Sequence, residues 1–205
     1  VREPYSSLTH YVYDPLVNLT ACALVLLGGL GFLVWRDVWE NRLHFRRYSL
    51  HSKLILTASA ILVAGGAALF WLAERNNLLA GMNPGQQALV SLFQAVSPRT
   101  AGFNTVDLAQ LTSGGGLLTI VLMFIGAGPG STGGGVKITT VVVCLLTLSS
   151  YIRGRREVGA FNRRLDEEQI HRSAAGVTLY MTLAMAGGFL ILATQPFPLQ
   201  DALFE

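Results

Sequence analysis

Charged residues are scarce in this chain and are missing from long blocks of it. Only 13% of the 205 residues are Asp, Glu, Lys or Arg, whereas a soluble domain carries about a quarter. Hydrophobic residues make up 51%. Because the charges are gathered between uncharged blocks rather than thinly spread, the composition predicts an integral membrane protein.

Other reactive groups are also few, and their scarcity excludes several functions. The two cysteines, Cys22 and Cys144, lie in apolar segments, so we expect buried thiols and no disulfide. The four histidines have no metal-ligand spacing, and the apolar segments contain no paired carboxylates or catalytic triad. The net charge of +3 is too small to indicate nucleic-acid binding. We therefore expect no enzyme, no cofactor in this chain and no nucleic-acid partner.

Four apolar segments are long enough to cross a bilayer, which takes about 20 helical residues. Residues 15–35, 54–73 and 174–194 are each predicted to form one span. The fourth segment, residues 116–151, would be roughly 54 Å long as a single helix, which is too long. It is interrupted by Gly126-Ala127-Gly128-Pro129-Gly130-Ser131-Thr132-Gly133-Gly134-Gly135.

Glycine and proline at this density cannot hold a helix, so the fourth segment is predicted to be two half-helices with an unwound middle. In hydrocarbon, unwound backbone survives only where protein or a water-filled cavity satisfies its N–H and C=O groups. The interruption therefore marks a place where ions, water or substrate approach the backbone. A kinked structural helix is the alternative. A phosphate-binding loop is disfavoured because Gly134 stands where its lysine would be and no strand precedes it.

A shorter helix is predicted before this interrupted segment. Asn83 can cap it, Pro84 suits its first position, and residues 86–97 continue without a breaker. At about 14 residues it covers roughly 21 Å and cannot cross the bilayer. Residues 98–105 then form an extended turn. A short helix followed by a returning turn predicts a re-entrant pore loop.

The distribution of basic residues predicts the orientation. The connections 36–53 and 151–173 are rich in arginine and lysine, whereas the long connection with the short helix holds only Arg75 and Arg99. By the positive-inside rule, the first two connections face the cytoplasm and the third faces outside. This alternation requires the short helix to re-enter without crossing. The basic connections can also contact anionic lipid or a regulatory protein.

An internal repeat supports the same organisation. Residues 84–89 recur in outline as residues 198–203, and each copy follows a membrane span. Repeats around a membrane site are typical of transporters and channels. Because residue 1 is not Met and the second copy is cut short, we expect the chain to be a piece of a longer protein. The expected fold is an all-α membrane fold of repeated helix–pore-helix–filter–helix units.

The turn Thr100-Ala101-Gly102-Phe103 is a candidate cation filter. Such a filter needs several backbone carbonyls that replace the water shell of the ion. Gly102 permits a backbone angle that other residues resist, and Thr100 adds a hydroxyl. The negative end of the preceding helix dipole also favours a cation. An ordinary turn on the outer side is the alternative, because glycine-containing turns are common.

Two motifs resemble the Trk/Ktr/HKT superfamily of potassium transporters. One is Ser97-Pro98-Arg99-Thr100-Ala101-Gly102-Phe103-Asn104-Thr105, and the other runs from Phe124 to Lys137. The Pro-Gly-Ser-Thr-Gly-Gly-Gly-x-Lys-x-Thr-Thr form is most similar to the Ktr membrane subunit. Residues 18–37 are similar to the second repeat of that subunit. The resemblance covers nearly the whole chain.

The resemblance implies four covalent repeats around a pseudo-fourfold pore, each giving one filter strand. Residues 1–52 would then be the end of repeat two, residues 53–165 the complete repeat three, and residues 166–205 the start of repeat four. Thr100, Ala101, Gly102 and Phe103 would offer carbonyls to K+, supported by Arg99 and Asn104. The implied gating loop below this filter consists of Gly126, Gly128, Pro129, Gly130, Ser131, Thr132, Gly133, Gly134, Gly135 and Lys137.

The resemblance also implies a potassium uptake transporter that works as a gated, channel-like pore. It implies a homodimer in the plasma membrane of a prokaryote, seated on a cytoplasmic nucleotide-binding ring of the RCK type, with Na+ as a possible stimulating ion. A Trk-type or HKT-type carrier of K+ or Na+ is the alternative within the family. An intramembrane enzyme and a non-transporting membrane subunit are alternatives from other classes.

Three charged side chains allow more than one interpretation. Lys137 either faces the cavity and holds the gate shut by repelling cations, or extends toward the cytoplasm. Arg99 is expected to anchor the filter turn by hydrogen bonds, because its charge would repel cations. Glu74 is expected to be a solvated charge at the outer end of its helix.

Overall fold

The structure is a computed structural model that describes residues 7–42, 44–155, 157–161, 163–195 and 204. The described residues form seven α-helices: α1 (Pro15–Gly29), α2 (Phe32–Asn41), α3 (Leu50–Glu74), α4 (Pro84–Val96), α5 (Ser113–Phe124), α6 (Ile138–Ile152) and α7 (Glu167–Thr194). They also form three 3-10 turns and one small hairpin: η1 (Thr9–Tyr11), η2 (Phe45–Arg47), η3 (Leu108–Gln110), β1 (Gly159–Ala160) and β2 (Arg163–Arg164).

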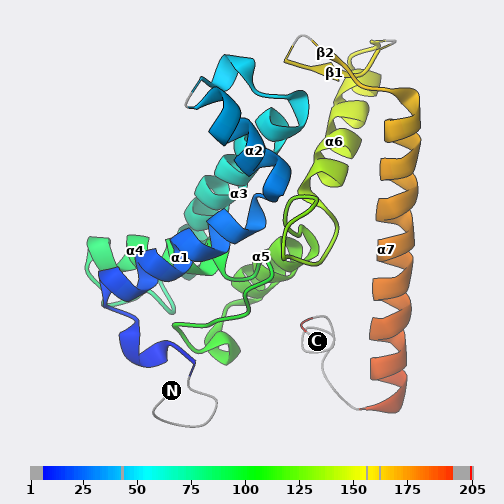
Figure 1. The fold of residues 1–205 in the computed structure, drawn as a ribbon. Coiled ribbons are helices and arrows are strands. Elements are labelled where there is room, and N and C mark those ends of the chain that lie inside the picture. Colours follow the sequence, from blue (N-terminus) through cyan, green and yellow to red (C-terminus); the bar gives the residue numbers. More distant parts are fainter. Residues whose placement is uncertain (1–6, 43, 156, 162, 196–203, 205) are drawn as a thin grey trace.

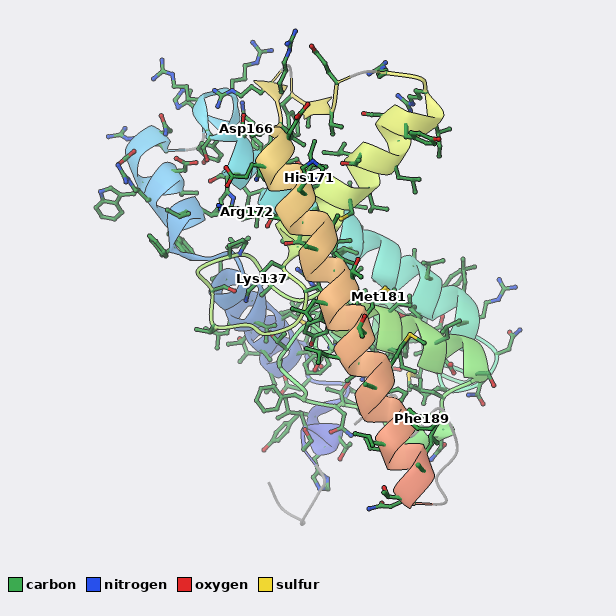
Figure 2. All side chains as sticks on the ribbon, turned by 90° about the vertical axis from the view of Figure 1, so that its right-hand side faces the viewer. Lys137, Asp166, His171, Arg172, Met181 and Phe189 are labelled. Carbon is green, nitrogen blue, oxygen red and sulfur yellow. The ribbon has the colours of Figure 1, made fainter. Side chains whose placement is uncertain are left out.

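Two helices are long and apolar enough to cross a membrane alone. They are α3, with 25 residues, and α7, with 28. Both agree with the spans predicted from the sequence. Helix α7 packs against α6, and much of its apolar surface faces outward, including Met181 and Phe189 (Figure 2).

Residues 15–35 were predicted to form one span. In the structure they lie in two helices, which are long and apolar enough for a span only as a bent pair. The chain bends by 93° between α1 and α2. Gly31 lies at the bend with φ +84°, outside the helical region, and this conformation is readily available only to glycine. We call residues 29–32 the elbow.

The fourth apolar segment is interrupted as predicted. Helix α5 ends at Phe124 and α6 begins at Ile138. The backbone between them is not helical, and its only regular pairing is a parallel bridge between Ile125 and Val136. We call residues 125–137 the glycine-rich loop; it lies beside the elbow in Figure 1.

The short helix before this segment is also confirmed. Asn83 accepts a hydrogen bond from the backbone N–H of Gln86, whose side chain accepts from the N–H of Asn83. This capping box and Pro84 at the first position fix where α4 begins. Helix α4 packs against α3 and α1, with Val90 and Phe93 buried.

The end of α3 is hydrogen-bonded to the start of α5, so the two ends of the chain segment between these helices lie side by side. Glu74, the last residue of α3, accepts hydrogen bonds from both the backbone N–H and the hydroxyl of Thr112. Asn77 donates to the Gln110 carbonyl at 2.7 Å. The expectation that Glu74 is solvated was wrong, because its exposed fraction is 0%. Its carboxylate holds Thr112, the N-cap residue of α5, whose hydroxyl accepts from the Gly115 N–H at 3.1 Å.

Three small buried clusters form the core rather than one large one. Phe70 of α3 and Val90 of α4 pack with Leu79 and Val106, and Cys22, Phe93 and Val96 join α1 to α4. Val34, Ile55 and Ile138 join α2, α3 and α6. The second and third clusters join elements that are distant in sequence, and Leu30 of the elbow and Ile125 of the glycine-rich loop both pack against the third.

The two basic connections lie at the same end of the molecule (Figure 1). One contains the end of α2 and η2, and the other contains the β1–β2 hairpin. This arrangement agrees with the prediction that both face one side of a membrane. The second copy of the internal repeat, residues 198–203, lies outside the described residues.

Candidate functional site

The candidate filter turn, residues 97–105, follows α4 directly. The backbone N–H groups of Ala101 and Gly102 both donate to the Ser97 carbonyl, at 3.1 Å each. Thr100 and Gly102 have positive φ, of 79° and 74°. Gly102 adopts this conformation without cost, whereas a β-branched threonine there is strained. The strain at Thr100 must be held by surrounding contacts, and strained residues of this kind are common at functional sites.

The carbonyl groups of this turn differ in their partners. The Phe103 carbonyl accepts a hydrogen bond from the Ser97 hydroxyl. Within the described residues, no hydrogen-bond donor reaches the carbonyls of Thr100, Ala101 or Gly102. Three consecutive carbonyls without a protein partner are available to water or to a cation.

Asn104 and Arg99 lie in the turn on either side of residues 100–103, and their contacts differ. Asn104 connects it to the beginning of the described chain, since its backbone N–H donates to the Ser7 hydroxyl and its carbonyl accepts from the Leu8 N–H. Arg99 is only 6% exposed, yet its Nε has no hydrogen-bond partner within the described ranges. Its side chain borders a small cavity that it shares with Gly29 and Ala127. Arg99 therefore lies between the filter turn, the elbow and the glycine-rich loop.

The glycine-rich loop is anchored to its own two half-helices by backbone hydrogen bonds. The N–H of Gly126 donates to the Val136 carbonyl at 2.9 Å, and the N–H of Val136 donates to the Phe124 carbonyl at 3.2 Å. The N–H of Ile138 donates to the Ala127 carbonyl at 3.2 Å. Some of the loop's backbone N–H and C=O groups, which lipid could not hydrogen-bond, thus find partners within the protein.

The tip of the loop is closed by side chains. The Ser131 hydroxyl donates to the Gly128 carbonyl at 2.6 Å and accepts from the Gly133 N–H at 3.3 Å. The ammonium group of Lys137 donates to the Gly133 carbonyl. Figure 2 labels Lys137 at this loop. This contact turns the Lys137 side chain back over the loop.

The filter turn and the glycine-rich loop touch each other. A Cβ placed on Gly133 would lie 2.6 Å from the Thr100 hydroxyl oxygen and 2.4 Å from the Ala127 Cβ. Only a residue without a side chain fits between these groups. The resemblance implied a gating loop below the filter, and the structure brings Thr100 and Gly133 into direct contact.

Sequence reasoning missed the elbow as part of this site. The N–H of Gly128 donates to the Gly29 carbonyl at 2.8 Å, and the N–H of Phe32 donates to the Gly130 carbonyl at 3.2 Å. The run Gly28-Gly29-Leu30-Gly31 was a usable signal, since three glycines in four residues weaken a helix. Its hydrophobic surroundings masked it, because the segment has the length of an ordinary span.

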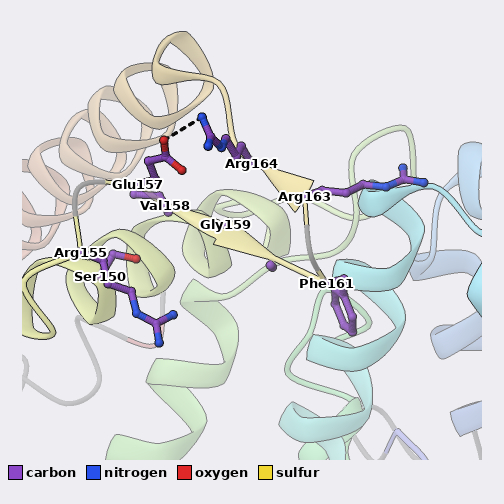
Figure 3. Close-up of a pocket in the computed structure, with 9 residues that line it drawn as sticks. Ser150, Arg155, Glu157, Val158, Gly159, Phe161, Arg163 and Arg164 are labelled. Carbon is purple, nitrogen blue, oxygen red and sulfur yellow. Dashed lines mark ion pairs between the residues drawn. The ribbon is translucent and has the colours of Figure 1, made fainter.

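A separate pocket of about 660 Å³ lies at the β1–β2 hairpin, away from the filter turn. Arg155, Arg163 and Arg164 line it, together with Glu157, which forms an ion pair with Arg164 at 2.7 Å (Figure 3). This basic surface belongs to one of the two connections expected to face the cytoplasm. It carries no group that suggests catalysis.

A family model and similar known proteins indicate the same family. A model described as the TrkH cation transport protein matches residues 3–205. The chain is 38% identical over 202 residues to the Ktr system potassium uptake protein B of Vibrio alginolyticus, covering 97% of this chain and 44% of that protein. It is 33% identical over 181 residues to the potassium/sodium uptake protein NtpJ of Enterococcus hirae, covering 88% and 40%.

A solved structure shows the same fold. The potassium transporter TrkH from Vibrio parahaemolyticus superposes with a TM-score of 0.73 at 18% identity, over 92% of this chain and 41% of that one. The chain thus spans less than half the length of each of these relatives. The relatives are named for ion uptake, which agrees with the expectation that the chain is not an enzyme.

Proposed function

The chain belongs to the TrkH family of cation transport proteins, and on this premise we propose that it forms part of a K+ uptake transporter with a gated, channel-like pore. Two relatives with the Ktr name, from Vibrio alginolyticus and Bacillus subtilis, are called potassium uptake proteins. The proposal assigns K+ as the transported ion and gives the filter turn and the glycine-rich loop separate roles in moving it.

In this proposal the described helices belong to three successive repeats. Helices α1 and α2 end repeat two (residues 1–52), α3 to α6 make up repeat three (residues 53–165), and α7 begins repeat four (residues 166–205). Only one filter strand is then present in this chain. The selective site forms when the carbonyls of Thr100, Ala101, Gly102 and Phe103 meet the matching strands of the complete protein.

The glycine-rich loop acts as the gate. Its position next to the filter turn supports this role, because a segment under the filter can obstruct ions that leave it. The observation that carries the proposal is the contact of Thr100 with Gly133, where a single methyl group would not fit. Glycines with φ of 70° at position 130 and 72° at position 135 give the loop turns that other residues resist. Movement of such a segment is a common way to switch a pathway.

The filter assignment is tested by K+ uptake in cells that lack their own potassium uptake systems. The full-length protein with Gly102→Ser should lose K+ affinity and selectivity over Na+. Gly81→Ser is the matched control, because Gly81 has a similar φ of 83° and also has no atom within 4 Å of its Cβ position. If both variants retain the parent affinity and selectivity, the filter assignment is wrong.

The gate assignment is tested by shortening the loop. Removal of residues 130–135 from the full-length protein should raise the maximal K+ uptake rate, because less backbone obstructs the pathway. The variant must elute as the parent does in size-exclusion chromatography. A well-folded variant with unchanged or lost uptake contradicts the gate assignment.

Na+ is the second candidate ion. The relative NtpJ is named for potassium and sodium uptake, and Na+ could be carried or could stimulate K+ uptake. Uptake of radioactive Na+, measured with and without K+, separates these possibilities. Saturable Na+ uptake in the absence of K+ supports carriage, and faster K+ uptake on addition of Na+ supports stimulation.

We also propose that the complete protein is a homodimer in a prokaryotic plasma membrane and binds a cytoplasmic nucleotide-binding ring of the RCK type. The basic surface at Arg155, Arg163 and Arg164 is a suitable contact for such a ring or for anionic lipid. Replacing these three arginines with glutamine should weaken co-purification of the ring. Unchanged co-purification would exclude this surface as the contact.

A further inference from the structure

The elbow and the glycine-rich loop are two non-helical breaks that interlock. They come from different broken helices, the α1–α2 pair and the α5–α6 pair. Two backbone hydrogen bonds join them, from the Gly128 N–H to the Gly29 carbonyl and from the Phe32 N–H to the Gly130 carbonyl. Gly29 is the last residue of α1 and Phe32 is the first of α2. The loop is therefore held by both arms of the elbow.

The fit between the two breaks is close enough to exclude side chains. A Cβ on Gly31 would lie 2.4 Å from the Pro129 carbonyl oxygen, and a Cβ on Gly128 would lie 2.7 Å from the Leu30 carbonyl oxygen. The Phe32 ring lies over Gly130, 2.9 Å from a Cβ placed there. Backbone packs on backbone on both sides of the contact, so neither segment can shift far while the other stays in place.

The geometry of the bend makes this contact sensitive to the angle between α1 and α2. The acceptor on Gly29 moves with α1, whereas the donor on Phe32 moves with α2. Because hydrogen bonds weaken steeply with distance and misalignment, both can persist only near the observed 93° bend. Opening the elbow must break at least one of them, and release of the loop removes both.

We propose that the elbow holds the gate closed. Release of the glycine-rich loop and a change of the α1–α2 bend are then one coupled step. This inference rests on the proposed gating function. Gly31 and Phe32 are positioning residues, since they act on the ion pathway through the loop. The coupling joins two repeats, because the elbow lies in repeat two and the loop in repeat three.

Helix α2 links the elbow to the connection expected to face the cytoplasm. The Asp37 carboxylate accepts hydrogen bonds from the Ser49 N–H at 3.0 Å and from its hydroxyl at 2.5 Å. Ser49 in turn caps α3. A force applied to this connection can therefore reach the elbow along α2, over about 7.5 Å of helix between Asp37 and Phe32.

The test compares two glycines of similar φ, 84° at Gly31 and 83° at Gly81, in the full-length protein. Gly31→Ala forces a methyl group into the Pro129 carbonyl, whereas Gly81→Ala, at a φ of 83°, meets no atom within 4 Å. Both variants carry Ser131→Cys as a reporter in a protein otherwise free of cysteine. The readouts are the rate of thiol modification by an impermeant reagent in inside-out vesicles and the rate of K+ uptake.

We expect Gly31→Ala to speed modification of the reporter by about tenfold, the effect of losing roughly one hydrogen bond's net contribution. Uptake should rise with it, and Gly81→Ala should leave both rates at the parent value. Equal modification rates in the two variants overturn the coupling, whatever loop shortening does. A third outcome separates the two proposals. If Gly31→Ala speeds modification but K+ uptake changes neither in this variant nor after removal of residues 130–135, the coupling is supported and the gate assignment is rejected.

A second pair of variants applies if Gly31→Ala fails to fold. Phe32→Pro removes the N–H that donates to Gly130, and proline is well tolerated at the first position of a helix. Phe32→Leu keeps this N–H and is the control. Faster modification in Phe32→Pro than in Phe32→Leu supports the coupling, and equal rates overturn it.

Discussion

Glu74 accepts two hydrogen bonds from Thr112, one from the backbone N–H at 2.8 Å and one from the hydroxyl at 2.6 Å. These bonds join the end of α3 to the start of α5, at the two ends of the segment that holds α4 and the filter turn. A buried carboxylate is stable only when its oxygens are hydrogen-bonded, and here Asn77 donates to the second oxygen at 2.9 Å. The pair fixes where the segment with α4 and the filter turn begins and ends.

Loss of this carboxylate should destabilise the protein. Glu74→Ala leaves the Thr112 N–H buried without its acceptor, which costs about 1–3 kcal/mol. We expect a lower Tm for the full-length protein in detergent. Glu74→Gln keeps one carbonyl oxygen as an acceptor and should fall between the parent and the alanine variant. A Tm for Glu74→Ala equal to that of the parent would contradict this role.

The neighbouring glycines of α5 provide a matched test of the same contact. A Cβ on Gly115 would lie 2.1 Å from the Glu74 Oε1, whereas a Cβ on Gly114 would meet only ordinary contacts at 3.8 Å and 4.0 Å. Gly115→Ala should therefore lower Tm. Gly114→Ala should raise it slightly, because alanine favours a helix over glycine by about 1 kcal/mol. The same sign of shift in both variants would count against the contact.

The contact of the filter turn with the loop predicts the effect of Gly133→Ala. The added methyl group collides with Thr100 and Ala127, so the loop must move away from the turn. We expect a higher K+ uptake rate in cells that depend on the transporter. Gly134→Ala adds a methyl group in open space on the same loop and should have a clearly smaller effect. Equal effects would mean that loss of glycine flexibility, not the collision, is responsible.

Lys137 should hold the loop closed through its hydrogen bond to the Gly133 carbonyl. Lys137→Met removes the donor but keeps a long apolar side chain, so the loop should open more readily and K+ uptake should increase. Lys137→Arg retains a cationic donor and should stay nearer to the parent. The alternative is that Lys137 acts only through its charge, by repelling cations. In that case the difference in K+ uptake between Lys137→Met and the parent should shrink at high salt. The hydrogen bond to Gly133 predicts no such salt dependence.

Asn18 should stabilise the segment before α1 that is hydrogen-bonded to the filter turn. Its side chain is fully buried and donates to the carbonyls of Tyr11 and Asp14, at 2.7 Å each. It thereby fixes the segment whose Leu8 N–H binds the Asn104 carbonyl. Asn18→Ala should cost about 0.5–1.5 kcal/mol and lower Tm, because the carbonyls of Tyr11 and Asp14 each lose the amide donor and keep only a backbone N–H. An unchanged Tm would show that water replaces the amide.

Much of this fold could be predicted, because many of its features depend on the residues of one segment alone. The spans at α3 and α7 follow from length and apolarity, and α4 follows from the cap formed by Asn83 and Gln86. The break before Lys137 follows from glycine density alone. These features depend on neighbours within a few residues, and such local rules are legible in a sequence.

The error at Glu74 and the bend at the elbow, which was not predicted, have a different origin. Glu74 looked solvated because its partner, Thr112, lies far along the chain. The elbow looked like part of a straight helix because what stabilises its bend is the backbone of Gly128 and Gly130 in another helix pair. The sequence by itself determined the membrane class, the spans, the break and the two motifs of the candidate site. Only the tertiary structure decided that the two breaks interlock, because hydrogen bonds and steric fit between distant segments leave no local pattern.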